Sequence, residues 1–211
     1  MAPDMRARFA LMAATLAAST VFSGHPMAYV ASGPIWSQPQ TPYYINQTTL
    51  DLPGSSAEAA VRSGANAWWL QSGAFRFAYT GLSAQTTTTY DGINLVLFRN
   101  ASSGSAIATT YWWSSGSRIV DADIVFWDGA FQFFAGASGC SGGFYIEDIA
   151  AHEFGHALGL GHSTSTNATM YPSVSYCNMG NRTLDGDDIA GVTALYPSHS
   201  PSAPTGFRIV S

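Results

Sequence analysis

Lysine is absent from this chain of 211 residues, and all eight basic residues are arginines. Charged residues make up only 10% of the sequence, and the formal net charge is −5. A chain without a basic stripe offers little to a phosphate backbone, so we do not expect nucleic acid as a partner. The mild acidity also argues weakly against acidic polymers as substrates.

The chain lacks an apolar run long enough to span a bilayer comfortably. The longest candidate, residues 9–22, is rich in alanine and follows two arginines, which is the layout of a secretory signal peptide. We therefore predict a signal peptide at residues 1–28, and a secreted protein with no membrane contact once the signal is removed. The cleavage position stays open between Ala28 and an alternative near Ser19. An amphipathic or buried N-terminal helix is the other interpretation.

Cysteine occurs only twice, at Cys140 and Cys177. In an oxidising compartment two cysteines favour a disulfide, with two free thiols as the alternative. The bridge would close a loop of about 38 residues and contribute roughly 4 kcal/mol in the chain-entropy model. Because the pair brackets residues 152–162, a disulfide would hold both flanks of that segment.

Apolar side chains are plentiful enough for one substantial core, since 46% of the residues are hydrophobic and 13% are aromatic. Apolar runs and alternation predict strands at residues 42–46, 75–79, 93–98, 106–113 and 118–127. Helical periodicity predicts a first helix capped by Ser55 or Ser56, a second starting near Gly143, and a last one capped by Asp185 and ended by Pro197. The order of these elements predicts an α+β fold.

The most informative segment is residues 152–162, which read HEFGHALGLGH. His152 and His156 are four residues apart, so on a helix their imidazoles lie on one face and can bind one metal ion. Two glycines then let the chain leave the helix and bring His162 beneath the same ion. Three imidazoles leave one corner of a zinc tetrahedron open, which is typical of a catalytic zinc site.

Glu153 follows the first histidine and can face a water in that open corner as a general base. A chance match to three histidines, one glutamate and one glycine at these spacings is on the order of 10⁻⁷ per starting position. The alternatives are a helix that merely carries histidines, and a site that binds metal without turnover.

The pattern HExxHxxGxxH followed by a methionine turn resembles that of the metzincin zinc proteases, and Met170 would be the methionine. Within the metzincins the chain resembles a matrixin, the catalytic domain of matrix metalloproteases. Ser163 follows the third histidine, the turn reads TMYP, and residues 184–197 read LDGDDIAGVTALYP. The resemblance covers residues 36–197, and leaves residues 198–211 as a Ser/Pro-rich tail.

This resemblance implies a twisted, mostly parallel sheet with an antiparallel edge strand, plus three helices. It implies that a protein or peptide substrate lies extended along the strand near residues 106–113. Tyr171, Pro172 and Tyr176 would wall the main specificity pocket, although a lone tyrosine such as Tyr176 is also a common core residue.

The last helix has a further implied role. One acid of the pair Asp187 and Asp188 would hydrogen-bond the methionine turn, while the other could be a simple helix N-terminal acid.

Several departures from the matrixin pattern limit what carries over. The only other histidines are His25 and His199, in the predicted signal and tail, so we do not expect a second, structural zinc. No cysteine precedes the domain, which excludes latency through a thiolate on zinc. Calcium is possible near four acids, although solvated loop acids are the alternative for each of them: Asp91, Asp121, Asp123 and Asp128.

The predicted function is a secreted, monomeric, extracellular zinc endopeptidase, with the extracellular matrix as an implied setting. One zinc on His152, His156 and His162 would acidify a water, and Glu153 would take its proton and return it to the leaving amine. Two other classes stay open. One is a secreted zinc-containing binding module without turnover, and the other is a zinc aminopeptidase, which would need an acidic anchor for a free amine.

Overall fold

The computed structural model describes the backbone of residues 5–13 and 28–197, and side chains within 28–197. The strands are β1 (Met5–Ala13), β2 (Val30–Ala31), β3 (Gln40–Asn46), β4 (Arg76–Leu82), β5 (Leu95–Phe98), β6 (Ala106–Ser115), β7 (Arg118–Phe126), β8 (Phe133–Phe134), β9 (Phe144–Tyr145), β10 (Leu160–Gly161) and β11 (Ser173–Val174). The helices are α1 (Gly54–Ser72), α2 (Ile146–Leu158), α3 (Gly186–Leu195) and the short 3₁₀ helix η1 (Gly180–Arg182). The predicted tail, residues 198–211, lies outside the described residues.

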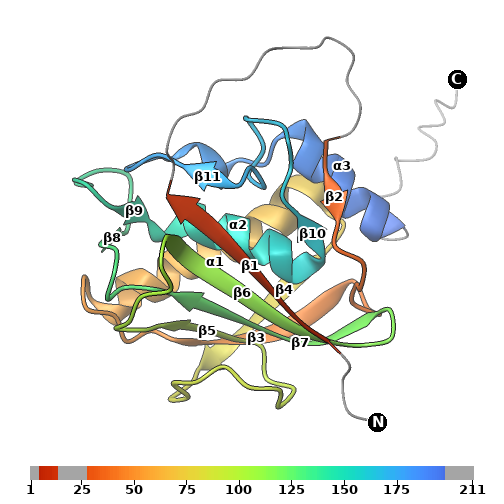
Figure 1. Ribbon diagram of the computed structural model, residues 1–211, viewed down its shortest axis with the longest axis horizontal. Coiled ribbons are helices and arrows are strands. Elements are labelled where there is room, and N and C mark those ends of the chain that lie inside the picture. Colours follow the sequence, from red (N-terminus) through yellow and green to blue (C-terminus); the bar gives the residue numbers. More distant parts are fainter. Residues whose placement is uncertain (1–4, 14–27, 198–211) are drawn as a thin grey trace, which may run out of the picture.

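The main sheet has the strand order β11-β1-β6-β7-β5-β3-β4 (Figure 1). Strands β4, β3, β5 and β7 pair in parallel, and β6 pairs antiparallel with β7. The predicted α+β fold with a mostly parallel sheet and one antiparallel strand beside it is therefore confirmed. Within residues 36–197, β6 is the edge of the run of strands from β4 to β6, as predicted, and β1, from the predicted signal peptide, pairs antiparallel along it.

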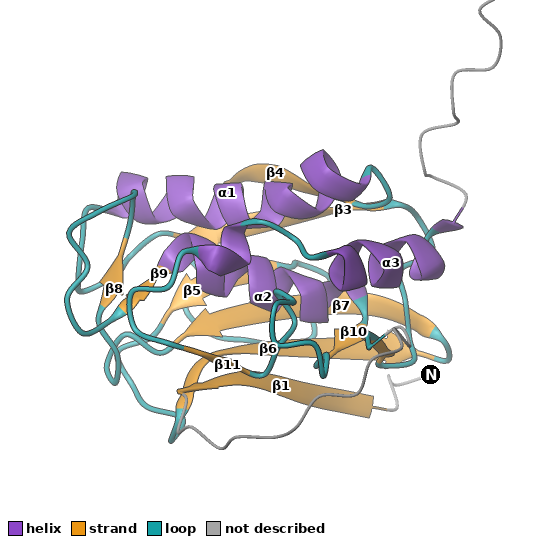
Figure 2. Ribbon diagram, turned by 90° about the horizontal axis from the view of Figure 1, so that it is seen from above, coloured by secondary structure: helices purple, strands orange, loops and turns teal. Residues whose placement is uncertain are grey.

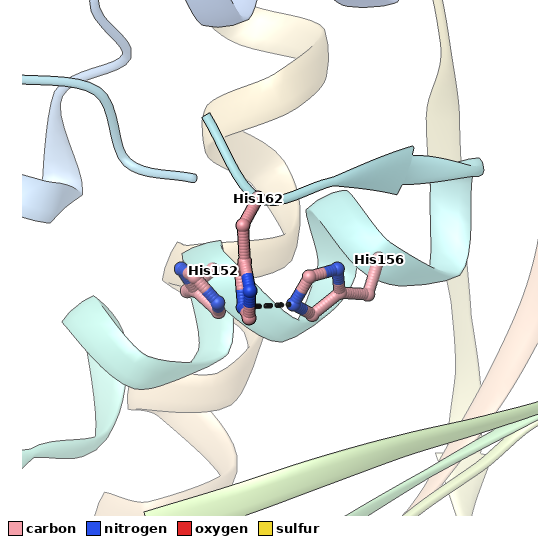
Figure 3. Close-up of side chains that lie close together, drawn as sticks. All are labelled: His152, His156 and His162. Atoms are coloured by element: carbon pink, nitrogen blue, oxygen red, sulfur yellow. Dashed lines mark hydrogen bonds between the residues drawn. The ribbon is translucent and has the colours of Figure 1, made fainter. Parts of the chain in front are cut away.

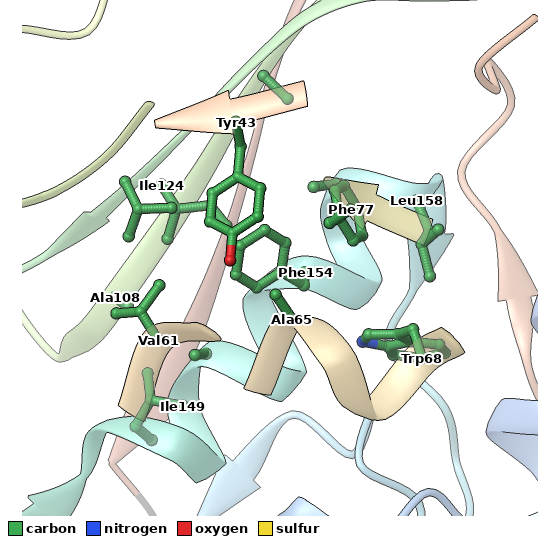
Figure 4. Close-up of a cluster of buried hydrophobic side chains, with 14 of the residues drawn as sticks. Tyr43, Val61, Ala65, Trp68, Phe77, Ala108, Ile124, Ile149, Phe154 and Leu158 are labelled. Atoms are coloured by element: carbon green, nitrogen blue, oxygen red, sulfur yellow. The ribbon is translucent and has the colours of Figure 1, made fainter. Parts of the chain in front are cut away.

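The helices cover one face of the sheet, as Figure 2 shows. The core between the two layers is built from apolar side chains of helices α1 and α2 and of strands that include β3, β4, β6 and β7 (Figure 4). Trp68 of α1 is fully buried, and its Nε1 donates to the carbonyl oxygen of Ala151 in α2 at 2.9 Å. A Cβ on Gly64 would lie 2.6 Å from the Ala150 Cβ, so glycine is needed where α1 crosses α2. This close packing fixes α2 against the rest of the core.

The opposite face of the sheet is also covered by apolar side chains. A second buried cluster gathers residues that alternate with those of the main core, namely Leu95, Leu97, Ala106, Tyr111, Trp113, Val125 and Trp127. Strand β5 contributes to both clusters, because Val96 and Phe98 belong to the main core. Burial on both faces explains why β5 reads as a continuous apolar run.

The helix starts differ in how they are capped. Helix α1 begins at Gly54 after Pro53, and no side chain caps it, so the prediction of a Ser55 or Ser56 cap is wrong. The backbone N–H groups of Ser56 and Ala57 donate instead to the Pro53 carbonyl, which places both serines inside the first turn.

Helix α3 starts as predicted, since Asp185 and Asp188 form a capping box there. Helix α2 starts at Ile146, three residues later than predicted, because Phe144–Tyr145 are drawn into a strand pair with β8.

The N-terminal region is described only in part. Residues 14–27 of the predicted signal peptide lie outside the described residues, and the signal peptide stays a prediction. Among the helices of the described residues, none combines the length and apolarity that crossing a bilayer would require.

Candidate metal centre and active site

Three histidine side chains from α2 and the segment after β10 converge on one another (Figure 3). His152 and His156 project from α2, and both are fully buried. Helix α2 ends at Gly159, which has a left-handed backbone (φ 104°) and leaves no room for a side chain, because a Cβ would meet the Pro34 carbonyl oxygen at 2.7 Å. The chain then turns through β10 to His162. Ligand atoms of the three histidines lie within 4.8 Å of one another, as the motif predicts.

The ring nitrogens are arranged to present lone pairs to one another. His152 Nδ1 lies 2.6 Å from the Thr169 carbonyl oxygen, and His156 Nδ1 lies 2.8 Å from the Leu160 carbonyl oxygen. A carbonyl only accepts, so each Nδ1 donates and each Nε2 is left as an acceptor. His156 Nε2 and His162 Nε2 lie 3.2 Å apart, and the buried His152 Nε2 has no hydrogen-bond partner in the described part of the chain.

Burial also keeps these imidazoles uncharged. It lowers the pKa of His152 to about 3, and it lowers the pKa of His156 and of His162 as well. Three neutral imidazoles with clustered acceptor nitrogens fit a divalent cation such as zinc. Within residues 28–197, this cluster contains no fourth histidine, cysteine or acid, which leaves a coordination position open.

Glu153 follows His152 in α2 and is fully buried. Its Oε2 accepts a hydrogen bond from Thr110 Oγ1 at 2.6 Å, and the same hydroxyl lies 3.0 Å from the Glu153 carbonyl oxygen. Thr110 lies on β6, 43 residues before Glu153, and sequence reasoning missed it. No sequence signal identifies it, because threonine is an ordinary residue in a strand.

The methionine turn packs directly beneath α2. A Cβ on Gly155 would lie 2.2 Å from Met170 Sδ, so the thioether touches the helix between the two helical histidines. The backbone N–H groups of Thr169 and Met170 donate to the Asp188 carboxylate at 2.7 and 3.1 Å. Of the two predicted acids, Asp188 makes this contact. The chain of bonds from Asp188 through Thr169 reaches the Nδ1 of His152.

Asp187 has a different role from the helix N-terminal acid considered above. Its Oδ1 accepts from the backbone N–H groups of Ala28 and Tyr29 at 2.7 and 3.0 Å. Its Oδ2 accepts from Ser163 Oγ at 2.7 Å. Asp187 therefore ties Ala28 and Tyr29, which precede the predicted matrixin domain, to the segment just after His162.

The predicted pocket residues follow the methionine turn. Tyr171 and Pro172 are half-buried, and β11 comes next in the chain. Tyr176 is 59% exposed, with its ring centroid 5.0 Å from that of Phe144. Its exposure excludes the core-residue alternative, while the pocket role of all three stays a prediction.

The predicted disulfide between Cys140 and Cys177 is present. It joins the loop after β11 to the loop before β9. The backbone N–H of Cys177 also donates to the Gly143 carbonyl oxygen at 2.9 Å. The two contacts hold the segment after the methionine turn against the approach to α2.

Three of the four acids considered for calcium are not solvated. Asp121, Asp123 and Asp128 are buried, so the solvated-acid interpretation is wrong for them. Asp121 accepts from the backbone N–H groups of Asp91 and Gly92, both at 2.8 Å. Burial raises the pKa of Asp121 to about 6 and that of Asp123, which also lies near Asp121, to about 8. Calcium binding there stays a prediction.

Comparison with known families agrees with this geometry. A family model described as Matrixin matches residues 35–197, and the chain belongs to the matrixin family. Matrixins are zinc-dependent endopeptidases.

Three relatives show how far the similarity extends. The chain is 52% identical to interstitial collagenase of Bos taurus over 59 residues, which cover 28% of this chain and 12% of that protein. It is 49% identical to neutrophil collagenase of Homo sapiens over 59 residues, covering 28% and 13%. It is also 49% identical to the hatching enzyme of Paracentrotus lividus over 67 residues, covering 32% and 11%. The aligned region thus spans only about an eighth of the length of these relatives.

Proposed function

We propose that this chain is a secreted zinc-dependent endopeptidase. The observation that carries the proposal is the cluster of three histidines within a matrixin domain, with the buried Glu153 next to His152 in the chain. His152, His156 and His162 would hold one zinc. When bound, zinc supplies Lewis acidity that lowers the pKa of a water and stabilises the oxyanion of the attacked carbonyl.

The protein's own groups supply proton transfer and position. Glu153 accepts a proton from the attacking water and delivers it to the departing amine nitrogen. The Thr110 hydroxyl, at 2.6 Å, holds the carboxylate in one orientation while this happens. The Thr169 and Leu160 carbonyls fix the ring orientation of His152 and His156.

The substrate is proposed to be an extended polypeptide along β6, with Tyr171, Pro172 and Tyr176 as the wall of the specificity pocket. Support comes from β1, since a segment of the chain itself pairs antiparallel along β6. The names of the collagenase relatives suggest extracellular matrix proteins as the substrate class. We infer secretion from the signal-like N-terminus and from the disulfide, which an oxidising compartment favours. A monomeric state remains part of the proposal.

The test compares the protein with its Glu153→Ala variant. Each of the two proteins is prepared in two forms, one without residues 1–28 and one that retains them. Metal analysis should give one zinc per chain in both variants. Digestion of a peptide library and of gelatin should be chelator-sensitive and should fall about 10²- to 10⁴-fold in Glu153→Ala. Equal cleavage by the variant would overturn the role of Glu153.

Other outcomes of the same test separate the alternatives. Stoichiometric zinc without cleavage of any substrate would favour a binding module. Stepwise removal of residues from peptide N-termini would favour an aminopeptidase. Absence of stoichiometric zinc would remove the basis of the proposal.

A further inference from the structure

Strand β1 occupies one strand position between β6 and β11. It runs antiparallel along β6 from the pair Met5 and Ser114 to the pair Met12 and Ala106. At its end it also pairs in parallel with β11, through Met12 with Ser173 and Ala13 with Val174. Figure 1 shows β1 crossing in front of α2, beside β6 and ending at β11. Neighbouring strands lie about 4.8 Å apart, so the space from β6 to β11 accepts one extended chain.

This position coincides with the candidate active site. Phe9 of β1 pairs with Thr110 of β6, and Thr110 is the residue whose hydroxyl contacts the Glu153 carboxylate. The backbone edge along which a substrate would pair is therefore already used by β1 at the level of Glu153. An extended peptide and β1 cannot both pair with that edge of β6.

We propose that Met5–Ala13 is an internal occupant of the peptide-binding edge, and that a chain retaining this segment is inhibited toward peptide substrates. The proposal rests on the proposed endopeptidase function. Residues 14–27 join β1 to Ala28, so β1 meets β6 within one chain, and this pairing needs no second molecule from solution. A free peptide must be captured from solution, so β1 holds an advantage over a free peptide of similar intrinsic affinity.

The inhibition differs from latency through a cysteine thiolate, because Met5–Ala13 contains no cysteine. The occupant is backbone that pairs with backbone, and it lies inside the predicted signal peptide, residues 1–28. If that segment is removed on export, the same cut that releases the protein opens the peptide-binding edge.

The first experiment uses the full chain, loaded with zinc, and the single variants Ala10→Pro and Leu11→Pro. Along an antiparallel strand, the backbone N–H groups point alternately toward one neighbouring strand and the other. Proline at either position 10 or position 11 must therefore remove a hydrogen bond to β6. We expect kcat/KM for a fluorogenic peptide to rise about tenfold in at least one variant. The control Ala17→Pro, placed beyond the strand, should match the unmodified chain. Unchanged kcat/KM in both β1 variants would overturn the proposal.

A second readout does not depend on turnover. Hydrogen exchange in Ala106–Ser115 should accelerate in at least one β1 proline variant, only at those β6 amides that face β1, while amides that face β7 stay protected. Equal exchange in all chains would overturn the proposal. If no form of the chain cleaves peptides, the proposed function fails, and the exchange comparison still decides whether β1 covers β6.

A third experiment adds the β1 segment back as a separate peptide. A synthetic peptide with the sequence of residues 5–13 should inhibit the activated proline variant competitively, and a scrambled peptide should not. Equal potency of the two peptides would count against recognition of this segment.

Discussion

At the residue scale, α2 and the methionine turn can pack closely because Gly155 has no side chain. Gly155 lies between the two helical histidines, and a Cβ there would approach Met170 Sδ to 2.2 Å and Trp68 Cζ2 to 2.6 Å. Both neighbours are buried, so neither can move into solvent. Glycine at this position costs helix propensity, and the packing beneath the histidines requires it.

We expect Gly155→Ala to destabilise the protein by up to about 2 kcal/mol. Overpacking of roughly 1–3 kcal/mol should outweigh a helix-propensity gain of about 1 kcal/mol. Urea unfolding of the zinc-loaded protein measures the difference. Gly186→Ala is the matched control, because its Cβ would meet nothing within 4 Å and the change should be neutral or stabilising. A Gly155→Ala protein as stable as the control would contradict the packing argument.

At the element scale, the segment from β11 to η1 is held firmly at its ends and weakly in its middle. The methionine turn is bonded to Asp188, and Arg182 of η1 donates to the buried Asp148 at 2.7 Å. Between these anchors, Tyr176 and Met179 are exposed. The Cys140–Cys177 disulfide is the covalent constraint in this middle part, and Cys177 itself adopts a left-handed backbone (φ 58°).

Replacing both cysteines by serine should lower the free energy of unfolding by about 2–4 kcal/mol, because the unfolded chain regains the freedom of a long loop. Denaturant unfolding with and without reductant measures this loss. Hydrogen exchange should rise most at residues 173–179 and least at Gly180–Arg182, which Asp148 still holds. A uniform rise across both segments would argue against a local role for the disulfide.

The elements also show where sequence reasoning succeeds. Strand β5 and helix α3 were predictable, because an apolar run and an aspartate cap are local signals. The start of α1 was not predictable from the sequence. Its first backbone N–H groups donate to the Pro53 carbonyl oxygen, and a backbone carbonyl leaves no side-chain signal. The pairing of β1 was also not predictable, because residues 9–22 have the composition of a signal peptide and pairing partners depend on the assembled sheet.

At the scale of the whole molecule, apolar clusters on both faces of the sheet force some acids into the interior. Asp121 and Asp123 are both fully buried on β7, and each accepts backbone N–H groups from residues 89–95. Burial raises the pKa of both carboxyls, and Asp91 and Asp121 add to the effect on Asp123. The loop before β5 is thus held by the Asp121 and Asp123 carboxyls, whose raised pKa favours their protonated forms.

Stability should therefore fall as pH rises toward 8. A raised pKa means that, above about pH 4, the folded protein retains protons that the unfolded chain has released. The histidines act in the opposite direction, but only below about pH 7, where the unfolded chain protonates them. Between pH 7 and 8.5, with zinc in excess, we expect a loss approaching ~1 kcal/mol per pH unit.

The Asp123→Asn variant isolates this contribution. Its urea unfolding free energy should depend less on pH than that of the unmodified protein, whatever its absolute stability. Glu58→Gln on α1 is the control and should keep the original slope. Identical slopes in all three proteins would show that Asp123 does not titrate in this range.

The sequence by itself determined the chemistry that is local in the chain. Histidines four apart on a helix share a face, glycine permits the turn to His162, and two cysteines in one chain can pair, whatever surrounds them. The tertiary structure decided which distant groups meet these residues. Thr110 reaches Glu153 because β6 packs on α2, and β1 reaches the same edge because β6 and β11 leave one strand position between them. Such meetings depend on packing across long sequence separations, which no local pattern records.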